Sequence, residues 1–253
     1  MAPPANCRVN LSPDQITAGV LAGGFGTRVR HLLPNLPKPM APVQGKPFLE
    51  WAVRYLAKQG LRRVVLATGH LAESVERHFA GQPVPDVSVR CVAEVKPLGT
   101  AGGFLNATRG AAGKPAAWLV LNGDSLALAP LEPLLSAGAD PALSGAVLGV
   151  PMTDASRYGT ILQDAEGRLT GFREKQPGAG LINAGVYLFP AAVVDRFPRR
   201  EPLSFETDVF PALIERGSRL KVCVTRAPFL DIGTPESLPL AEAFVRQNLE
   251  WFA

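Results

Sequence analysis

ITAGVLAGGFGTR, residues 16–28, decides the fold, because an apolar run leads directly into a glycine-rich turn. The run Ile16–Ala22 has the length and composition of a buried strand. Gly23, Gly24 and Gly26 follow where that strand ends. Glycine lets backbone N–H groups approach a polyphosphate, since no Cβ stands in the way. A tight turn at a strand end gives the same pattern, so the glycines alone leave both interpretations open.

Strand-like and helix-like stretches alternate from this turn to about residue 122. Pro47 opens an amphipathic helix that Gly60 ends. Further strands are expected at 62–68, 87–93 and 116–122, and further helices at 71–80 and from about Ala101. This alternation predicts a parallel, doubly wound sheet.

The pattern changes after about Ser144. Strand-like segments follow one another at 144–150, 158–164, 167–175 and 181–189, with short turns between them. A helical stretch at 206–217, a strand at 220–225 and a helix from about Pro235 close the chain. No linker separates the halves. We therefore expect a flexible N-terminal extension at 1–15 and a single domain at 16–253, with a mixed, mostly parallel sheet.

Composition excludes several classes of protein. Hydrophobic residues make up 47% and charged residues 19% of the 253 residues, as in soluble globular proteins. The net charge of +4 comes from scattered basic residues without a stripe, so we expect no nucleic-acid partner. The sequence has no apolar run of about 18 residues, so we expect no membrane span. Cys7, Cys91 and Cys223 are distant from one another and fit free thiols in the cytoplasm.

Two basic residues follow the glycine-rich turn. Arg28 comes directly after it, and Lys38 lies ten residues later between two prolines. The turn is neither the G-x-G-x-x-G dinucleotide fingerprint nor a Walker loop, since no Gly-Lys-Ser/Thr follows. A guanidinium and an ammonium at a phosphate site neutralise the charge that develops during phosphoryl transfer.

Two aspartates follow apolar stretches that we expect to be strands. Asp124 ends LVLNGD, and Asp231 lies in FLDIGTP. A pair of carboxylates, completed by substrate phosphates, is the ligand set that Mg²⁺ prefers. Aspartate is also a common turn and helix-capping residue, so the residue types alone do not distinguish a metal site from two structural aspartates.

A family resemblance joins these segments. The segments that carry it are AGGFGTR (22–28), PKPM (37–40), PLGTAGG (97–103), NGD (122–124), RYG (157–159), FREK (172–175), NAGVY (183–187) and DIGTP (231–235). In this order they resemble the sugar-1-phosphate nucleotidylyltransferases, over almost the whole chain from about Ile16. MAPVQGKPFLEW (40–51), SRYGTI (156–161) and GLINAGVYLF (180–189) look most like the heptose-1-phosphate guanylyltransferases. The extension before the first strand departs from the family pattern.

The resemblance implies a fold, a reaction and a set of site residues. The fold is a Rossmann-like three-layer α/β sandwich of the nucleotide-diphospho-sugar transferase type, and the reaction joins a nucleoside triphosphate to a sugar 1-phosphate with release of pyrophosphate. The implied catalytic residues are Arg28, Lys38, Asp124 and Lys175, with Mg²⁺ held by Asp124 and Asp231. The implied nucleotide-binding residues are Leu21, Ala22, Gly23, Gly24, Gly26, Thr27, Arg28, Glu94, Gly99, Thr100, Asn122 and Gly123. The implied sugar-phosphate residues are Tyr158, Gly159, Glu174, Lys175, Asn183 and Gly185.

Chemistry supports part of this assignment and leaves part open. Glu94 offers only acceptors, and guanine presents two adjacent donors, so the pair favours GTP over UTP. Glu94 could instead be solvated, with backbone alone reading the base. Glu174 and Lys175 suit sugar hydroxyls and a phosphate, although a solvated pair before a loop looks the same. Tyr158 and Gly159 could equally be packing residues. One alternative is a uridylyl- or other nucleotidylyltransferase that acts on a different sugar 1-phosphate, of the amino-sugar, mannose or glucose type. The other is a non-catalytic sugar-nucleotide-binding subunit. A homo-oligomer is possible.

Overall fold

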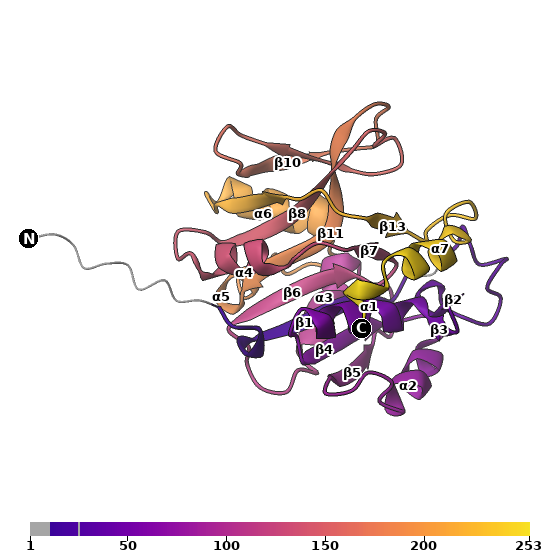
Figure 1. The fold of residues 1–253 in the computed structure, drawn as a ribbon. Helices are drawn as coiled ribbons and strands as arrows, with labels where there is room; N and C mark the ends of the chain where they lie inside the picture. The colour runs from indigo at the N-terminus through magenta and orange to yellow at the C-terminus, as the bar shows by residue number, and fades with distance from the viewer. Residues whose placement is uncertain (1–10, 25) are drawn as a thin grey trace, which may run out of the picture.

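One large mixed sheet forms the centre of the molecule (Figure 1). The computed structural model describes residues 11–24 and 26–253. The parallel half of the sheet has the order β6-β1-β4-β5 and consists of β1 (Ile16–Ala22), β4 (Arg63–Thr68), β5 (Ser88–Ala93) and β6 (Ala117–Asn122). The strands expected in the first half of the sequence are therefore confirmed, and they pair in parallel.

Alternating side chains on these strands build three layers. Val20 of β1 and Leu119 of β6 belong to one core, which the helices α1 (Phe48–Lys58) and α2 (Ala72–Ala80) cover. Trp118 and Val120 point to the opposite face and pack with Phe104 of α3 (Thr100–Thr108). Because neighbouring residues of a strand face opposite sides, each apolar strand contributes to both cores. The three-layer sandwich follows from that alternation.

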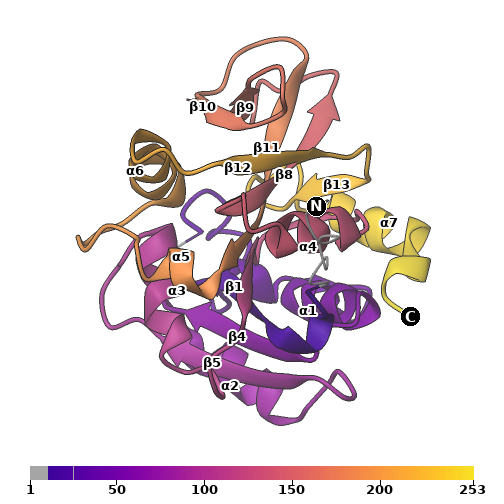
Figure 2. The same ribbon diagram turned by 90° about the vertical axis from the view of Figure 1, so that its left-hand side faces the viewer.

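The second half extends the sheet with mostly antiparallel strands. They are β8 (Gly145–Met152), β9 (Thr160–Gln163), β10 (Leu169–Arg173), β11 (Gly180–Pro190) and β12 (Leu220–Val224). The long β11 pairs antiparallel with β6, β8 and β9, whereas β12 pairs parallel with β8. Figure 2 shows β9, β10 and one end of β11 projecting beyond the parallel half. The sheet is thus mixed, as the sequence predicts.

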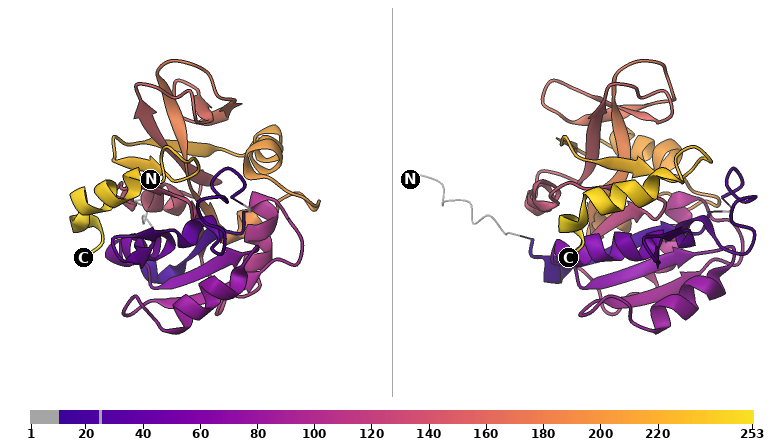
Figure 3. Two further views of the ribbon diagram at one scale, coloured as in Figure 1. Left: turned by 90° about the vertical axis from the view of Figure 1, so that its right-hand side faces the viewer. Right: turned by 45° about the vertical axis from the view of Figure 1, so that its right-hand side comes forward.

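Short elements complete the fold. They are β2 (Pro42–Val43), β3 (Lys46–Pro47), β7 (Ser125–Ala127), β13 (Phe229–Asp231), α4 (Glu132–Ala139), α5 (Ala191–Val194), α6 (Phe210–Glu215), α7 (Leu240–Gln247), the 3-10 helices η1 (Pro13–Gln15), η2 (Lys38–Met40) and η4 (Leu249–Trp251), and the π-helix η3 (Phe205–Val209). Figure 3 shows α7 beside the face of the molecule that carries α1, and the rings of Trp51 and Phe252 meet there at 5.2 Å.

The segments near the two ends of the chain add detail to the sequence-based expectations. The last helix begins at Leu240, not at about Pro235, because Pro239 has no N–H to continue a helix from residue 235. Residues 1–10 of the expected flexible extension, with Cys7, lie outside the described residues. The turn Pro13–Gln15 is held to the sheet: Ala116 N donates to Gln15 O at 2.8 Å.

Two further sequence expectations concern thiols and membranes. Cys91 and Cys223 are free, and burial raises the pKa of each thiol to about 11. Among residues 11–24 and 26–253, no helix is both long enough and apolar enough to cross a membrane.

The strand order places a crevice at the end of β1. The chain runs from β1 through α1 to β4 on one side, and later returns through α3 to β6 on the other side of β1. Such a topological switch point leaves a gap outside the carboxyl ends of the strands, where α/β sheets bind ligands. The glycine-rich turn, Glu94 and Asp124 all follow strands that end at this edge.

Candidate active site

A cavity of about 300 Å³ opens at this edge of the sheet. It is lined by Leu21, Gly23, Gly24, Ala67, Glu94, Pro97, Gly99, Thr100, Gly103, Asn122 and Asp124. Eight of these are among the residues that the sequence assigns to the nucleotide or the metal. Its floor is the end of β1 and β6, and its wall is the start of α3 and the loop before it. A mixed apolar and polar lining with carboxylates at two sides suits a nucleotide.

The other predicted nucleotide residues support the cavity or lie outside it. Ala22 and Gly123 are buried, and Gly123 N donates to Leu21 O at 2.8 Å, which ties the β6 turn to β1. Gly26 packs against the Cβ of Lys38. Thr27 and Arg28 are exposed to solvent and do not line the cavity.

Glu94 presents its carboxylate inside the cavity among glycines. A Cβ at Gly23 or Gly69 would lie 3.1 or 3.0 Å from Glu94 Oε1, and one at Gly103 would lie 3.5 Å from Oε2. Leu98 N donates to Oε2 at 3.2 Å. Burial raises the pKa of the Glu94 carboxyl above its ordinary value, and the Leu98 N–H opposes the shift. Glu94 is thus half-buried in the cavity lining, a position that favours a role in binding over that of a fully solvated side chain.

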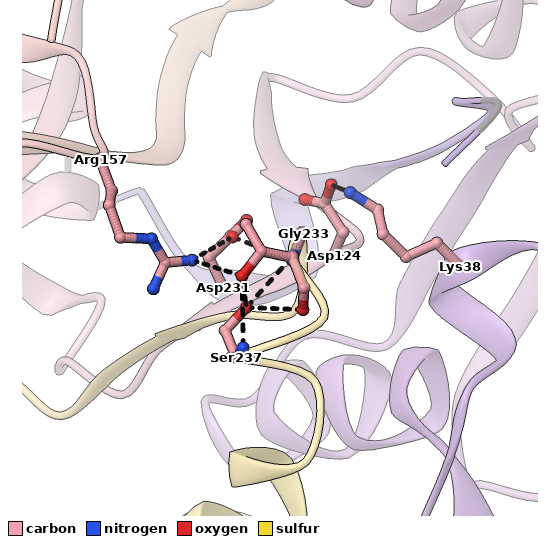
Figure 4. A network of polar contacts seen from close by, with 7 residues as sticks. Lys38, Asp124, Arg157, Asp231, Gly233 and Ser237 are labelled. Carbon is pink, nitrogen blue, oxygen red and sulfur yellow. Dashed lines mark hydrogen bonds and ion pairs between the residues drawn. The ribbon is translucent and has the colours of Figure 1, made fainter. Parts of the chain in front are cut away.

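The two aspartates converge through a small second sheet. β13 pairs antiparallel with β7, so that Asp231 faces Ser125, and Ile232 N donates to Asp124 O at 2.9 Å. Lys38 Nζ donates to Asp124 Oδ2 (Figure 4). Gly233 N donates to Asp231 Oδ1 at 2.9 Å. The fold therefore joins residues about a hundred positions apart, as the metal hypothesis requires.

The electrostatics of this pair favour a cation. Burial and then the charge of Asp124 raise the pKa of the Asp231 carboxyl, while the Gly233 N–H, Lys38 and Arg157 lower it. Only one of the two carboxylates has an ammonium in direct contact. Two adjacent hard oxygen donors with open positions for phosphates fit Mg²⁺, which keeps several waters or substrate oxygens. No group of three or more potential metal ligands occurs in the described part of the chain, so phosphates or waters would have to complete the shell.

Arg157 is a site residue that sequence reasoning did not single out. Its guanidinium lies 3.8 Å from Asp231 Oδ1 and donates to Thr234 Oγ1 at 3.2 Å (Figure 4). The neighbouring Tyr158 packs edge-on against Phe229. The RYG segment contained the signal, but Arg157 and Asp231 are far apart in the sequence, so nothing local indicated their contact.

The predicted sugar-side residues divide into two groups. Asn183, Gly185, Tyr158 and Gly159 lie together: Asn183 N donates to Gly159 O at 2.9 Å, and Gly185 packs against Asn122 of the cavity. Glu174 and Lys175 instead follow the end of β10 and are exposed. The structure does not bring these two side chains into the cavity lining. They stand on the part of the molecule that projects beyond the parallel half.

Comparison with known proteins assigns the chain to a family. A family model described as nucleotidyl transferase matches residues 17–248. The chain belongs to the nucleotidyl transferase family. This enzyme family accounts for the arrangement just described, in which a glycine-rich turn, a lysine and carboxylates meet around one cavity.

Relatives of this nucleotidyltransferase include guanylyltransferases. It is 35% identical over 229 residues to mannose-1-phosphate guanylyltransferase of Mycobacterium tuberculosis, covering 89% of this chain but 63% of that protein. It is 33% identical to D-glycero-alpha-D-manno-heptose 1-phosphate guanylyltransferase of Aneurinibacillus thermoaerophilus, covering 88% of this chain and 95% of that protein. The homologues are thus sugar-1-phosphate nucleotidylyltransferases.

A solved structure supports the same fold. HddC from Yersinia pseudotuberculosis, crystallised in complex with GMP-PN, has a TM-score of 0.79 and 30% sequence identity. The match covers 90% of this chain and 98% of that chain. The predicted fold class is confirmed.

Proposed function

We propose that this nucleotidyltransferase is a guanylyltransferase that joins GTP to a sugar 1-phosphate, preferably a heptose 1-phosphate, with Mg²⁺ as cofactor. The products are a GDP-sugar and pyrophosphate. The observation that carries the proposal is that Glu94 and Asp124 line one cavity, while Lys38 and Asp231 lie beside Asp124.

The choice of GTP rests on Glu94. Guanine presents N1–H and an exocyclic amine side by side, and an ionised carboxylate accepts both in a bidentate manner. Uracil and thymine present one N–H between two carbonyls, so the same carboxylate would face a repulsive oxygen. Cytosine offers an amine beside a bare ring nitrogen. Leu98 N holds one carboxylate oxygen in place, which preorganises Glu94 for this task.

The phosphate chemistry needs positioning and charge neutralisation more than covalent help. A sugar-phosphate oxygen attacks the α-phosphorus in line, and pyrophosphate leaves; the nucleophile is already anionic, so no general base is required. Bound Mg²⁺ supplies positive charge beside the triphosphate at Asp124 and Asp231. Lys38 holds phosphate oxygens, backbone amides of the glycine-rich turn bind others, and Arg28 stabilises the charge that develops during the displacement.

The sugar phosphate binds on the side of β11. Lys175 contacts its phosphate, Glu174 accepts from sugar hydroxyls, and Asn183 with Gly185 borders the sugar. Glu174 and Lys175 are exposed after the end of β10, so both side chains are accessible to a sugar phosphate.

The preference for heptose over mannose rests on the extent of the similarity. The chain covers 95% of the A. thermoaerophilus heptose enzyme but 63% of the M. tuberculosis mannose enzyme, although the identities are similar. Mannose 1-phosphate is therefore the second candidate substrate. A non-catalytic sugar-nucleotide-binding subunit is disfavoured, because such a module has no need for the lysine and carboxylate cluster.

A pyrophosphate-release assay tests the proposal directly. The purified protein is supplied with GTP, UTP, dTTP, CTP or ATP, each with heptose, mannose, glucose or amino-sugar 1-phosphate. GTP with heptose 1-phosphate should give the highest kcat/KM. The variant Glu94→Gln should reduce the preference for GTP over UTP by at least about tenfold, since the amide presents a donor to one guanine donor. A wild-type preference for UTP or dTTP would show that Glu94 does not read the base.

A further inference from the structure

A chain of hydrogen-bonded polar groups runs from the sugar side of the cavity through the buried Tyr187 to Glu206 and Ser204; Asn183, Glu206 and Ser204 are partly buried. Asn183 Nδ2 donates to the Tyr187 hydroxyl at 2.8 Å, and that hydroxyl donates to Glu206 Oε1 at 2.9 Å. Ser204 Oγ donates to the other oxygen, Oε2, at 3.0 Å. Tyr187 is fully buried among Phe189, Phe205 and Phe210. A buried hydroxyl without a hydrogen-bond partner would destabilise the fold in this apolar environment, so the Tyr187 hydroxyl depends on its bonds to Asn183 and Glu206.

The carboxylate of Glu206 fixes the direction of this chain. Burial and the charge of Glu206 raise the pKa of Tyr187 far above its ordinary range, so the phenol keeps its single proton. A carboxylate only accepts, so the proton must point to Glu206, and the hydroxyl oxygen must accept from Asn183. The Asn183 carboxamide then has one orientation, with its Oδ1 facing Gly185 N at 3.0 Å.

That orientation holds an irregular part of β11. The pairing of β11 with β8 shifts register between Asn183 and Tyr187, which marks a bulge. Gly185 within it has a φ of +70°, and a Cβ there would lie 2.3 Å from Asn122 Nδ2. Asn122 lines the cavity beside Asp124. The Asn183 side chain thus braces a bulge whose tip supports the cavity floor.

The other end of the chain is attached to the nucleotide side. Residues 203–206, which carry Glu206, are joined to the loop at the start of α3 by four hydrogen bonds: Ala101 N and Gly102 N donate to Leu203 O at 3.0 and 3.1 Å, Leu203 N donates to Leu98 O at 2.7 Å, and Phe205 N donates to Thr100 Oγ1 at 3.1 Å. This loop contains Gly99 and Thr100 of the cavity. Glu206 is also the second residue of the π-helix η3, a helix form that is frequent at functional sites.

We propose that Glu206 and Tyr187 are positioning residues that link the two substrate subsites: through Asn183 they hold the sugar-side bulge in register with the nucleotide loop. The inference rests on the proposed function, because it concerns where sugar phosphate and nucleotide meet. Neither residue lines the cavity, so neither is a catalytic residue. Their effect is to place the sugar phosphate opposite the nucleotide, where a misplacement of about 1 Å costs roughly a hundredfold in rate.

The variant Tyr187→Phe tests the link, since it removes one oxygen and keeps the aromatic packing. We expect kcat/KM for the sugar phosphate to fall by at least about tenfold, with the KM for GTP changed less than about threefold. Phe210→Leu is the matched control, because Phe210 packs against Tyr187 with ring centroids 5.0 Å apart but takes no part in the polar chain. It should lower Tm and leave kcat/KM for the sugar phosphate unchanged. An equal fall in kcat/KM in both variants would overturn the proposal.

A second pair of variants and an activity-free measurement separate this proposal from the proposed function. Glu206→Gln retains an oxygen for the Tyr187 hydroxyl and should keep most activity, whereas Glu206→Ala should behave like Tyr187→Phe. Hydrogen exchange of the Gly185 amide should accelerate by roughly tenfold or more in Tyr187→Phe but not in Phe210→Leu. Unchanged exchange at Gly185 overturns the link even in an active enzyme. Faster exchange in Tyr187→Phe, combined with a wild-type protein that lacks guanylyltransferase activity, would retain the link and reject the proposed function alone.

Discussion

Lys38 Nζ donates to Asp124 Oδ2, although 86 positions separate the two residues in the sequence. Lys38 belongs to η2, which follows the glycine-rich turn, and Asp124 follows β6. The contact brings an ammonium to the site where the metal and the triphosphate are proposed to meet. A point charge on a flexible stem can leave the carboxylate and contact phosphate as substrate binds.

Replacement of Lys38 should therefore impair the reaction more than the fold. We expect Lys38→Ala to lower kcat/KM for GTP by about a hundredfold or more, because one preorganised charge at a transition state contributes on that scale. Lys38→Arg should recover only part of the activity, since its fork reaches phosphate with a different geometry. Steady-state kinetics with pyrophosphate detection measures both. Lys114→Ala, which removes an exposed surface pair with Asp195, is the control and should behave as wild type.

The carboxylates should govern metal dependence. Asp124→Asn and Asp231→Asn should each lose most activity, on the order of several kcal/mol in the transition state, and remain folded. Mg²⁺ should raise the Tm of the wild type and not of either variant, because only the intact pair binds it tightly. Asp140→Asn, at an exposed turn, should respond to Mg²⁺ like the wild type. Full turnover of the wild type in EDTA contradicts the metal assignment.

Lys175 should act on one substrate only. Lys175→Ala should raise the KM for the sugar phosphate by roughly tenfold or more and leave the KM for GTP nearly unchanged, because its ammonium is assigned to the sugar phosphate. Arg28→Ala should instead lower kcat more than it raises either KM. A rise confined to the KM for GTP in Lys175→Ala would mean that the two subsites are exchanged.

Local sequence signals predicted the strand and the turn beside the cavity well. The strand Ile16–Ala22 and the glycines after it depend on neighbouring residues alone, and Gly23 and Gly24 line the cavity in the structure. The alternation of strands and helices likewise predicted the parallel half. Helix α4 was not anticipated, because Pro133 and Gly138 within Glu132–Ala139 weaken its pattern.

Long-range contacts could not be predicted in the same way. Arg157 reaches Asp231, and Glu206 reaches Tyr187, only because the sheet topology brings separate segments together. In the sequence, Arg157 and Glu206 look like solvated charges. For Glu174 and Lys175 the sequence says more than the structure: the family resemblance assigns them roles with the sugar phosphate, whereas their exposed positions in the structure indicate no role by themselves.

The pH dependence of GTP binding should report on Glu94. Burial raises the pKa of this carboxyl, so as pH falls it takes up a proton earlier than an ordinary glutamate with a pKa of 4.5. The KM for GTP should therefore rise as pH falls toward that raised pKa, since a protonated carboxyl cannot accept both guanine donors. Glu94→Gln should flatten this limb of the profile. An unchanged limb in the variant would assign it to another group.

The raised pKa of Glu94 affects stability in the opposite direction: GTP binding should weaken as pH falls, whereas the stabilising contribution of this carboxyl should be lost as pH rises. A raised pKa in the folded state means that the folded protein binds the proton more tightly, so the contribution to stability is complete below the unfolded pKa. It is lost as pH rises through the raised value. Glu94→Gln should therefore gain stability relative to the wild type at neutral pH and not at pH 4, as measured by urea unfolding at each pH.

Gly185 offers a test of how tightly the bulge in β11 is packed. It has a φ of +70°, and an added Cβ would lie 2.3 Å from Asn122 Nδ2. Gly217 is its matched control, because its φ is +75° and nothing lies within 4 Å of an added Cβ. Gly217→Ala should cost about 1 kcal/mol from backbone strain alone and retain full activity. Gly185→Ala should cost about 1–3 kcal/mol more, because Asn122 must move. That movement displaces the cavity floor beside Asp124, so kcat should fall as well. Equal losses of stability in the two variants, with activity retained in both, would show that Asn122 yields freely and that the bulge does not hold the cavity in shape.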